Sequence, residues 1–231
     1  SSVAIDEQGD VVIAGAHENK WSHTAWGDGS IGYDDAGVSA GSGYANIYRH
    51  TNAVQTAYTS IATLDAPTTN DPVDGASRPN NYDNYGTAVA ISYNGKTVVV
   101  GATQFVDSFP AASGDGYLRV YKQDSASNSA PYVLHCELPS YHTQPHAAGI
   151  AMDVNGEFVV VGESYVPYNS YNAGQVRVFD IRDSTCAQWG NTILAPDSPS
   201  LGPIGNDEAR WGWSVAINTP SSISGANAQI I

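Results

Sequence analysis

One fifteen-residue phrase occurs three times in this chain, and it constrains the fold more than any other feature. Without gaps, residues 2–16 ("SVAIDEQGDVVIAGA") align with residues 88–102 ("AVAISYNGKTVVVGA") and residues 149–163 ("GIAMDVNGEFVVVGE"). Such internal similarity is typical of repeat architectures, in which each copy is one supersecondary unit that buries its apolar surface against its neighbours. We therefore expect a row of similar units.

Each unit is predicted to begin as a β-hairpin. In its first segment bulky aliphatic residues alternate with alanine, which indicates a strand with closely approaching neighbours. A Gln-Gly or Asn-Gly pair follows at residues 8–9, 94–95 and 155–156, and Asn-Gly between apolar segments is a strong signal for a tight hairpin turn. The run after the turn, such as "VVV" at residues 98–100, is typical of a strand buried on both faces.

Two more strands are expected in each unit. Residues 43–50 ("GYANIYRH"), 116–123 ("GYLRVYKQ") and 174–181 ("GQVRVFDI") alternate as half-buried strands do. A weaker fourth strand follows in "TAYTSIATL", "PYVLHCEL" and "QWGNTIL". Four sequential antiparallel strands make a propeller blade. The prediction is an all-β protein, one β-propeller segment over residues 1–231, with blades near residues 1–65, 86–139 and 148–196 and a partial blade at 211–231.

These motifs resemble the FG-GAP repeats of integrin α-chain-like β-propellers. The resemblance rests on "SVAIS..G..VVVGA", "G.VRVY" and "W..GN.I", and it covers nearly the whole chain apart from the loops. The usual proline after "VGA" is replaced by His17, Thr103 and Ser164. The resemblance implies seven blades and a role in adhesion. Because about three and a half blades are present, a further chain segment or another subunit is expected to supply the rest.

Charge and composition narrow the partners and the compartment. Nine Lys and Arg against 23 Asp and Glu give a net charge of −14, which disfavours nucleic acid and anionic membranes. No apolar run approaches the roughly 20 residues that span a bilayer. The abundance of Gly, Tyr, Ser, Asn and Thr is common in extracellular β proteins, so we expect a secreted or cell-surface protein that binds protein or glycan. Thr68 and Thr69 are candidates for O-linked sugar.

Two cysteines, Cys136 and Cys186, are the only ones in the chain. They either form one bridge in an oxidising compartment or remain buried thiols, and their spacing does not fit a zinc site. Both lie in successive fourth-strand regions, which belong to adjacent blades. Since outer strands diverge, a bridge between them requires a loop to bring the two residues together.

Calcium is a possible cofactor that the resemblance implies, since some repeats of this family bind Ca²⁺ between the first and second strands. The nearest match here is the run with Asp153, Asn155 and Glu157, whose alternative interpretation is an ordinary turn flanked by solvated acids. The Gly-rich insert "WGDGSIGYDDAG" offers Asp28 and Asp34, whose alternative is a solvated loop.

The long connections between second and third strands, and those between blades, lie on one face of a propeller. We call this the long-loop face. Aromatic side chains next to carboxylates and amides suit sugar stacking or protein contact; the alternative is that the rings pack onto their own blades. The candidate binding residues are Trp21, Trp26, Tyr82, Tyr85, Tyr165, Tyr168 and Tyr171.

No nucleophile elbow, phosphate loop or H-E-x-x-H motif occurs in the sequence. The first hypothesis is therefore a non-enzymatic extracellular propeller that acts in adhesion or in assembly of a cell-surface or filamentous structure. Two alternatives stay open. One is a glycan-binding lectin propeller, and the other is the accessory propeller of a larger secreted hydrolase.

Overall fold

The computed structural model of the chain describes residues 2–16, 24–25, 31–32, 43–50, 57–67, 85–102, 116–123, 128, 130–139, 147–164, 167–168, 171–172, 174–194, 212–218 and 229–230. All regular structure within these ranges is β-strand. No helix among them is long and apolar enough to cross a membrane.

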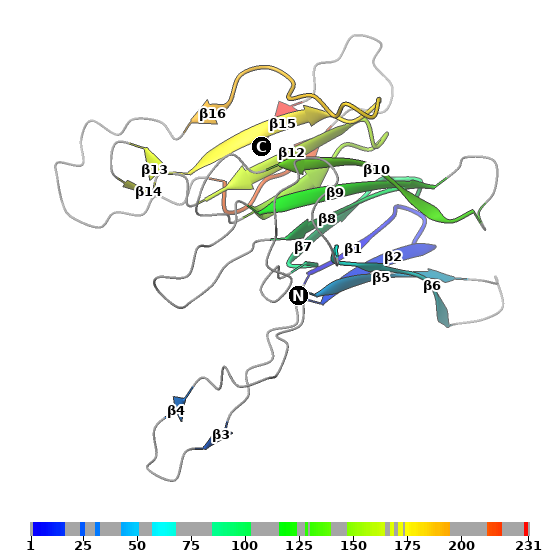
Figure 1. Cartoon of the computed structure of the whole chain (residues 1–231). Coiled ribbons are helices and arrows are strands. Elements are labelled where there is room, and N and C mark those ends of the chain that lie inside the picture. The colour runs from blue at the N-terminus through cyan, green and yellow to red at the C-terminus, as the bar shows by residue number, and fades with distance from the viewer. Residues whose placement is uncertain are drawn as a thin grey trace.

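Three four-stranded antiparallel sheets follow one another along the chain, as predicted. Each is one propeller blade, and Figure 1 shows them as a row that runs from blue through green to yellow. Blade 1 contains β1 (Ser2–Ile5), β2 (Val11–Ala16), β5 (Tyr44–His50) and β6 (Tyr58–Asp65). Blade 2 contains β7 (Ala88–Ile91), β8 (Thr97–Ala102), β9 (Tyr117–Gln123) and β10 (Tyr132–Pro139). Blade 3 contains β11 (Ala147–Met152), β12 (Phe158–Glu163), β15 (Gln175–Asp180) and β16 (Ile193–Leu194).

The central strand β8 shows how the blades stack. Successive side chains of a strand point to opposite faces, and here both faces are covered. Val98 and Val100 pack in an apolar cluster shared with blade 1, while Val99 packs in a second cluster shared with blade 3. All three are fully buried. The continuous valine run is therefore the sequence signature of a blade with a neighbour on each side.

The hairpin turns form a second line of contacts between blades. The backbone N–H of Glu7 donates to the carbonyl of Tyr93 at 3.3 Å, and the N–H of Tyr93 donates to the carbonyl of Val154 at 3.2 Å. These three residues occupy the same position in their repeats. Each turn thus binds the turn of the next blade through the backbone, whatever its side chain is.

The chain enters blade 2 through a close backbone crossing. Gly86 has a φ of +90°, and a methyl group added there would lie 2.4 Å from the carbonyl oxygen of Tyr44. Gly212 occupies the equivalent position before the fourth repeat unit and crosses Gly162 just as closely. A residue without a side chain is required at both places. The aromatic-Gly pairs of the repeat are therefore the points where the chain entering one blade packs its backbone directly against the previous blade.

The fourth strand of blade 3 is shorter than expected. The phrase "QWGNTIL" was expected to be one strand, but only Ile193–Leu194 pairs with β15 as β16, and Gln188 forms a single bridge to Phe179. Between them Gly190 has a φ of +75°, which an extended strand does not allow. The segment after β15 is therefore mostly a loop.

Three pairs of two-residue strands lie outside the blades among the described residues. β3 (Thr24–Ala25) pairs with β4 (Ile31–Gly32), and β13 (Pro167–Tyr168) pairs with β14 (Tyr171–Asn172), both within long connections. β17 (Ile217–Asn218) pairs with β18 (Gln229–Ile230). Val215 and Ile217 pack against Val160 of blade 3. The fourth repeat unit therefore continues the row of blades.

Candidate functional site

Most of the predicted binding aromatics lie outside the residues that the structure describes. These are Trp21, Trp26, Tyr82 and Tyr165. Tyr168 and Tyr171 belong to β13 and β14, where their backbones are directly paired. This short hairpin stands in the connection between β12 and β15, on the side of the blades where the long-loop face was predicted (Figure 1).

Tyr85 does not belong to a binding surface, which corrects the prediction. Its side chain is fully buried between blades 1 and 2, stacked on Tyr117 with ring centroids 6.0 Å apart. Its hydroxyl oxygen lies 2.8 Å from that of Tyr121, and the two hydroxyls share a hydrogen bond. Burial, with a smaller contribution from Tyr121, raises the pKa of Tyr85 well above its usual range. The ring is a core residue next to the Gly86 crossing.

The candidate calcium turn is held together by its own carboxylate. Asp153 is 1% exposed, and its Oδ1 accepts hydrogen bonds from the backbone N–H groups of Glu157 at 2.6 Å and Phe158 at 2.7 Å. Its Oδ2 accepts one from the N–H of Asn155 at 3.2 Å. Asp6 binds its own turn in the same way. In this geometry the Asp153 carboxylate serves as a cap for the hairpin turn.

Blade 2 carries the same cap with a neutral residue. Ser92 Oγ accepts a hydrogen bond from the N–H of Thr97 at 2.9 Å, so the cap needs an oxygen and not a charge. Among the described residues, no three His, Cys, Asp or Glu side chains gather closely enough to hold a metal ion. Asp28 and Asp34, the second candidate pair for calcium, lie outside those residues. Calcium binding stays a prediction.

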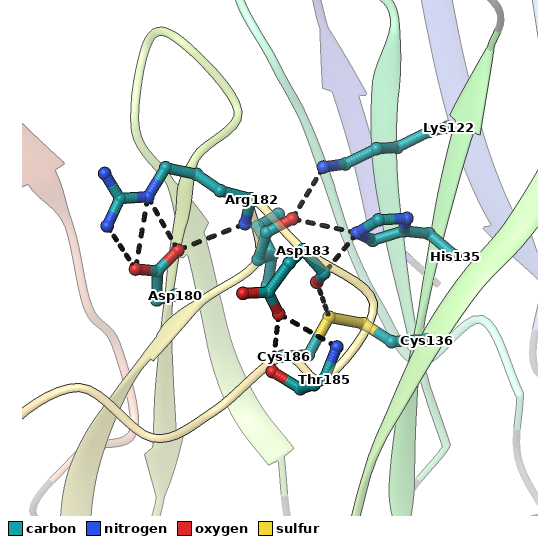
Figure 2. Close-up of a disulfide and its surroundings, with 9 residues drawn as sticks. Lys122, His135, Cys136, Asp180, Arg182, Asp183, Thr185 and Cys186 are labelled. Carbon is teal, nitrogen blue, oxygen red and sulfur yellow. Dashed lines mark hydrogen bonds and ion pairs between the residues drawn. A yellow bond between two sulfur atoms is a disulfide. The ribbon is translucent and has the colours of Figure 1, made fainter.

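A disulfide joins blade 2 to blade 3, and Figure 2 shows its surroundings. Cys136 lies on β10 and Cys186 lies in the loop between β15 and β16, with their Cα atoms 6.3 Å apart. Cys186 has a φ of +45°, a conformation that side chains seldom adopt. The loop at residues 181–186 thus bends back towards the outer strand of blade 2, which is how two diverging blades come within bonding distance.

Two side chains of blade 2, a lysine and a histidine, hold the same loop. Lys122 Nζ donates to the carbonyl of Ile181 at 2.6 Å, and His135 Nε2 lies 3.0 Å from the carbonyls of both Ile181 and Asp183. Figure 2 shows both side chains reaching the loop from the same side. Burial lowers the pKa of Lys122, while the carboxylates of Asp180 and Asp183 act against that shift. We call the disulfide and these contacts the interblade clamp.

The carboxylates of the clamp are engaged within the loop. The Asp183 side chain accepts hydrogen bonds from the Thr185 hydroxyl and backbone N–H, which lower the pKa of Asp183. Asp180 pairs with Arg182, which lowers the pKa of Asp180. Both acids lie at the surface, so they order the loop and do not form a buried reactive pair.

Each of two blades also buries an ion pair. Arg177 and Glu163 form a pair on adjacent strands, with Arg177 Nε 3.0 Å from Glu163 Oε2, and both side chains are almost inaccessible to solvent. Arg119 occupies the equivalent position in blade 2 and binds Glu137 at 2.9 Å. Burial lowers the pKa of Arg119, whereas the hydrogen bond to Glu137 raises it. The net effect is a pKa above its usual range. Because each arginine is paired with a carboxylate on the adjacent strand, the two ion pairs fix the strand register.

Comparison of the sequence with models of known protein families and with curated proteins gives no match. Among solved structures, the chain is similar to the β-propeller domain of Myceliophteria thermophila Cps50 (Swd1), at 11% identity and a TM-score of 0.44. The similar region covers 84% of this chain and 42% of that one. The three four-stranded sheets themselves establish the fold as a row of propeller blades.

Proposed function

We propose that this chain is a non-enzymatic, extracellular β-propeller segment that acts in adhesion or in the assembly of a cell-surface or filamentous structure by binding proteins. The FG-GAP resemblance is the source of this functional class. The interblade clamp is the observation that carries it best. Disulfides persist in oxidising compartments outside the cytosol, and Cys136 and Cys186 are bridged between two blades.

A clamped scaffold suits a protein that binds without catalysing a reaction. A surface held in place before binding loses less conformational entropy when a partner docks. The blades are fixed to each other by apolar cores, by backbone contacts between turns and by the clamp. The predicted contacts on the long-loop face, Trp21 and Trp26 above all, would be presented from this scaffold.

An adhesion assay tests the proposal. The full chain is immobilised, and attachment of cells or secreted proteins from the source organism is measured for the wild type and for Trp21→Ala with Trp26→Ala. We expect the double variant to weaken attachment by about thirtyfold or more, since aromatic anchors that a partner covers contribute more than about 1 kcal/mol each. Tyr93→Ala is the control, because Tyr93 is 43% exposed and lies in a hairpin turn at the opposite end of the blades.

Three results would overturn the proposal. They are equal attachment of both variants, a strong and specific signal on a glycan array without protein binding, and turnover of a polysaccharide by the purified chain. The second result would establish the lectin alternative, and the third would establish an enzyme.

A further inference from the structure

The outer strands of blades 1 and 2 carry exposed apolar side chains on the sides that face each other. We call these two facing surfaces, on β6 and β10, the outer seam. Leu134 of β10 is paired with Tyr121, which packs in the apolar cluster shared with blade 1, so Leu134 faces blade 1 as well. Leu134 is 40% exposed and Ile61 of β6 is 39% exposed. The opposite blade therefore leaves both side chains open to a further contact.

A bulge directs Ile61 towards blade 2. Each outer strand has a register shift at the same place, with Ile61 as the extra residue in β6 and His135 as the extra residue in β10. His135 reaches forward to the next blade, where its Nε2 lies 3.0 Å from the carbonyls of Ile181 and Asp183. Ile61 holds the same position in its repeat, so it is directed forward into the outer seam.

The apolar character of these positions is confined to the seam between blades 1 and 2. The residue equivalent to Leu134 in blade 1 is Ser60, and the residue equivalent to Ile61 in blade 2 is His135. The repeat thus carries polar residues at both positions elsewhere, and apolar ones only where the two strands face each other. Exposed apolar side chains that gather within a polar surface mark an interaction site.

A cation lies on the same surface without a carboxylate partner. Three of the four arginines that the structure describes form ion pairs with carboxylates. Arg49 is the fourth, and within the described ranges no acidic side chain pairs with it. Its Nη2 donates to Gln123 Oε1 of blade 2 at 3.1 Å. Arg49 is paired with Thr59 across β5 and β6, which places it on the face that carries Ile61.

Tyr132 is the second neutral group beside Arg49. Its hydroxyl donates to the carbonyl of Gly95 at 2.5 Å. Burial raises the pKa of Tyr132, and Arg49 acts against that shift, so the guanidinium lies close to the hydroxyl. Tyr132 is paired with Gln123 on the face of blade 2 that also carries Leu134. Arg49 thus bridges the two sides of the outer seam through neutral groups, and its charge is left uncompensated there.

The next pair of blades shows what fills the equivalent place. Lys122 is the repeat equivalent of Arg49, and its Nζ donates to the carbonyl of Ile181 at 2.6 Å. The Ile181 side chain is fully buried in the cluster between blades 2 and 3. A peptide segment there offers an oxygen to the cation and an apolar side chain to the blades. At the outer seam the cation is an arginine, whose planar fork matches a carboxylate through two parallel hydrogen bonds.

We propose that the outer seam binds a peptide segment of another protein, in which an Asp or Glu carboxylate pairs with Arg49 and a neighbouring large aliphatic side chain packs on Ile61 and Leu134. The site goes beyond the proposed function, since the long-loop face can bind proteins whether or not the seam does. The net charge of −14 repels an acidic ligand at long range. Affinity therefore comes from short-range hydrogen bonds and apolar contact.

An array of short synthetic peptides tests the proposal with the full chain. The peptides combine Glu or Gln at one position with Leu or Ser beside it, and we expect the wild type to bind the Glu-Leu peptides most strongly. Ile61→His with Leu134→Ser installs the residues of the equivalent repeat positions and should abolish that preference. Val133→Ser is the matched control, because Val133 is 60% exposed and is paired with Lys122, which faces blade 3.

Fluorescence anisotropy with a Glu-Leu peptide and its Gln-Leu counterpart tests the role of Arg49. Arg49→Gln should weaken binding of the Glu peptide about tenfold or more, and binding of the Gln peptide much less, because only the first loses a charge-assisted pair. Arg49→Lys keeps the charge without the fork and should fall between. Arg182→Gln is the control, since Arg182 already pairs with Asp180.

Three results would overturn the proposal. Equal weakening of both peptides by Arg49→Gln would show that Arg49 acts through the fold alone. A loss of binding in Val133→Ser as large as in the seam variant would place the contact elsewhere. An array on which the wild type shows no preference for Glu-Leu peptides would exclude this class of ligand, whatever the adhesion assay shows.

Discussion

At the scale of single residues, Gly86 is where two blades come closest through their backbones. Its φ of +90° and the carbonyl of Tyr44 leave no room for a side chain. We expect Gly86→Ala to lower the free energy of unfolding by more than about 2 kcal/mol, from backbone strain together with steric overlap. Urea denaturation monitored by tryptophan fluorescence measures the change.

Gly190→Ala is the matched control for this prediction. Gly190 also has a positive φ, +75°, but nothing lies within 4 Å of an added methyl group. The Gly190→Ala variant should lose about 1 kcal/mol of unfolding free energy, from backbone strain alone. Equal losses in the two variants would show that the blades do not cross closely at Gly86.

Asp153 yields a second prediction at this scale, about the role of the turn carboxylate. Asp153→Ala should lower the free energy of unfolding by about 1–3 kcal/mol, because buried backbone N–H groups lose their acceptor. Asp153→Ser should recover much of the loss, since Ser92 caps the equivalent turn of blade 2. Thermal unfolding of the three proteins, with and without Ca²⁺, is the measurement. A wild-type melting temperature that rises with Ca²⁺, and no longer rises in Asp153→Ala, would instead identify Asp153 as a calcium ligand.

The residue scale also shows what the sequence could and could not predict. The turn interpretation of Asp153 followed from the Asn-Gly pair beside it. Tyr85 was misplaced because it ends a long connection and was grouped with the loop aromatics. The repeat itself held the missing signal, since Trp211-Gly212 stands where Tyr85-Gly86 stands. An aromatic residue that recurs before a crossing glycine indicates packing between blades and not ligand binding.

At the scale of elements, the interblade clamp joins parts of the chain that lie 50 residues apart. Closing a loop of this length by a disulfide restricts the unfolded chain, with an effect of up to about 4 kcal/mol in the chain-entropy model. We expect Cys136→Ser with Cys186→Ser to unfold at a correspondingly lower urea concentration. Reductant should destabilise the wild type and leave the double variant unchanged. If reductant left the wild-type midpoint where it was, the clamp would have no part in stability.

The buried ion pair of blade 3 leads to a further prediction about elements. Glu163→Gln should lower the free energy of unfolding by about 3–5 kcal/mol, because the buried Arg177 charge loses its carboxylate partner. Asp180→Asn is the control, since its pair with Arg182 is exposed to solvent and should have little effect. The midpoint of urea unfolding measures both. Similar small changes would indicate that water reaches Arg177.

The strand pattern could be predicted from sequence because alternation and turn residues are local signals. Three complete blades appeared where the repeat placed them. The fourth strand of blade 3 is shorter than predicted because Gly190 interrupts it with a φ of +75°, while the disulfide and the contacts from Lys122 and His135 hold the preceding residues 181–186 as a loop. The pairs β3–β4 and β13–β14 were missed for a similar reason, because two-residue strands carry no periodicity.

At the scale of the whole molecule, the protein is a row of stacked blades whose middle blade is covered on both faces. β1, β7 and β11 are all first strands, and each pairs with only one other strand of its sheet. Their backbone pairing is thus alike. The same repeat position is buried where a described blade packs against it, since Val89 of β7 is 8% exposed beneath blade 1.

Amide hydrogen exchange, measured residue by residue by NMR, tests this account most directly. At low protein concentration we expect the amides of β1 to exchange faster than those of β7 and β11, since local opening is easier where no blade covers the strand. Equal protection of β1 and β7 would contradict the stacking of the blades, because it would show that blade 1 does not cover β7.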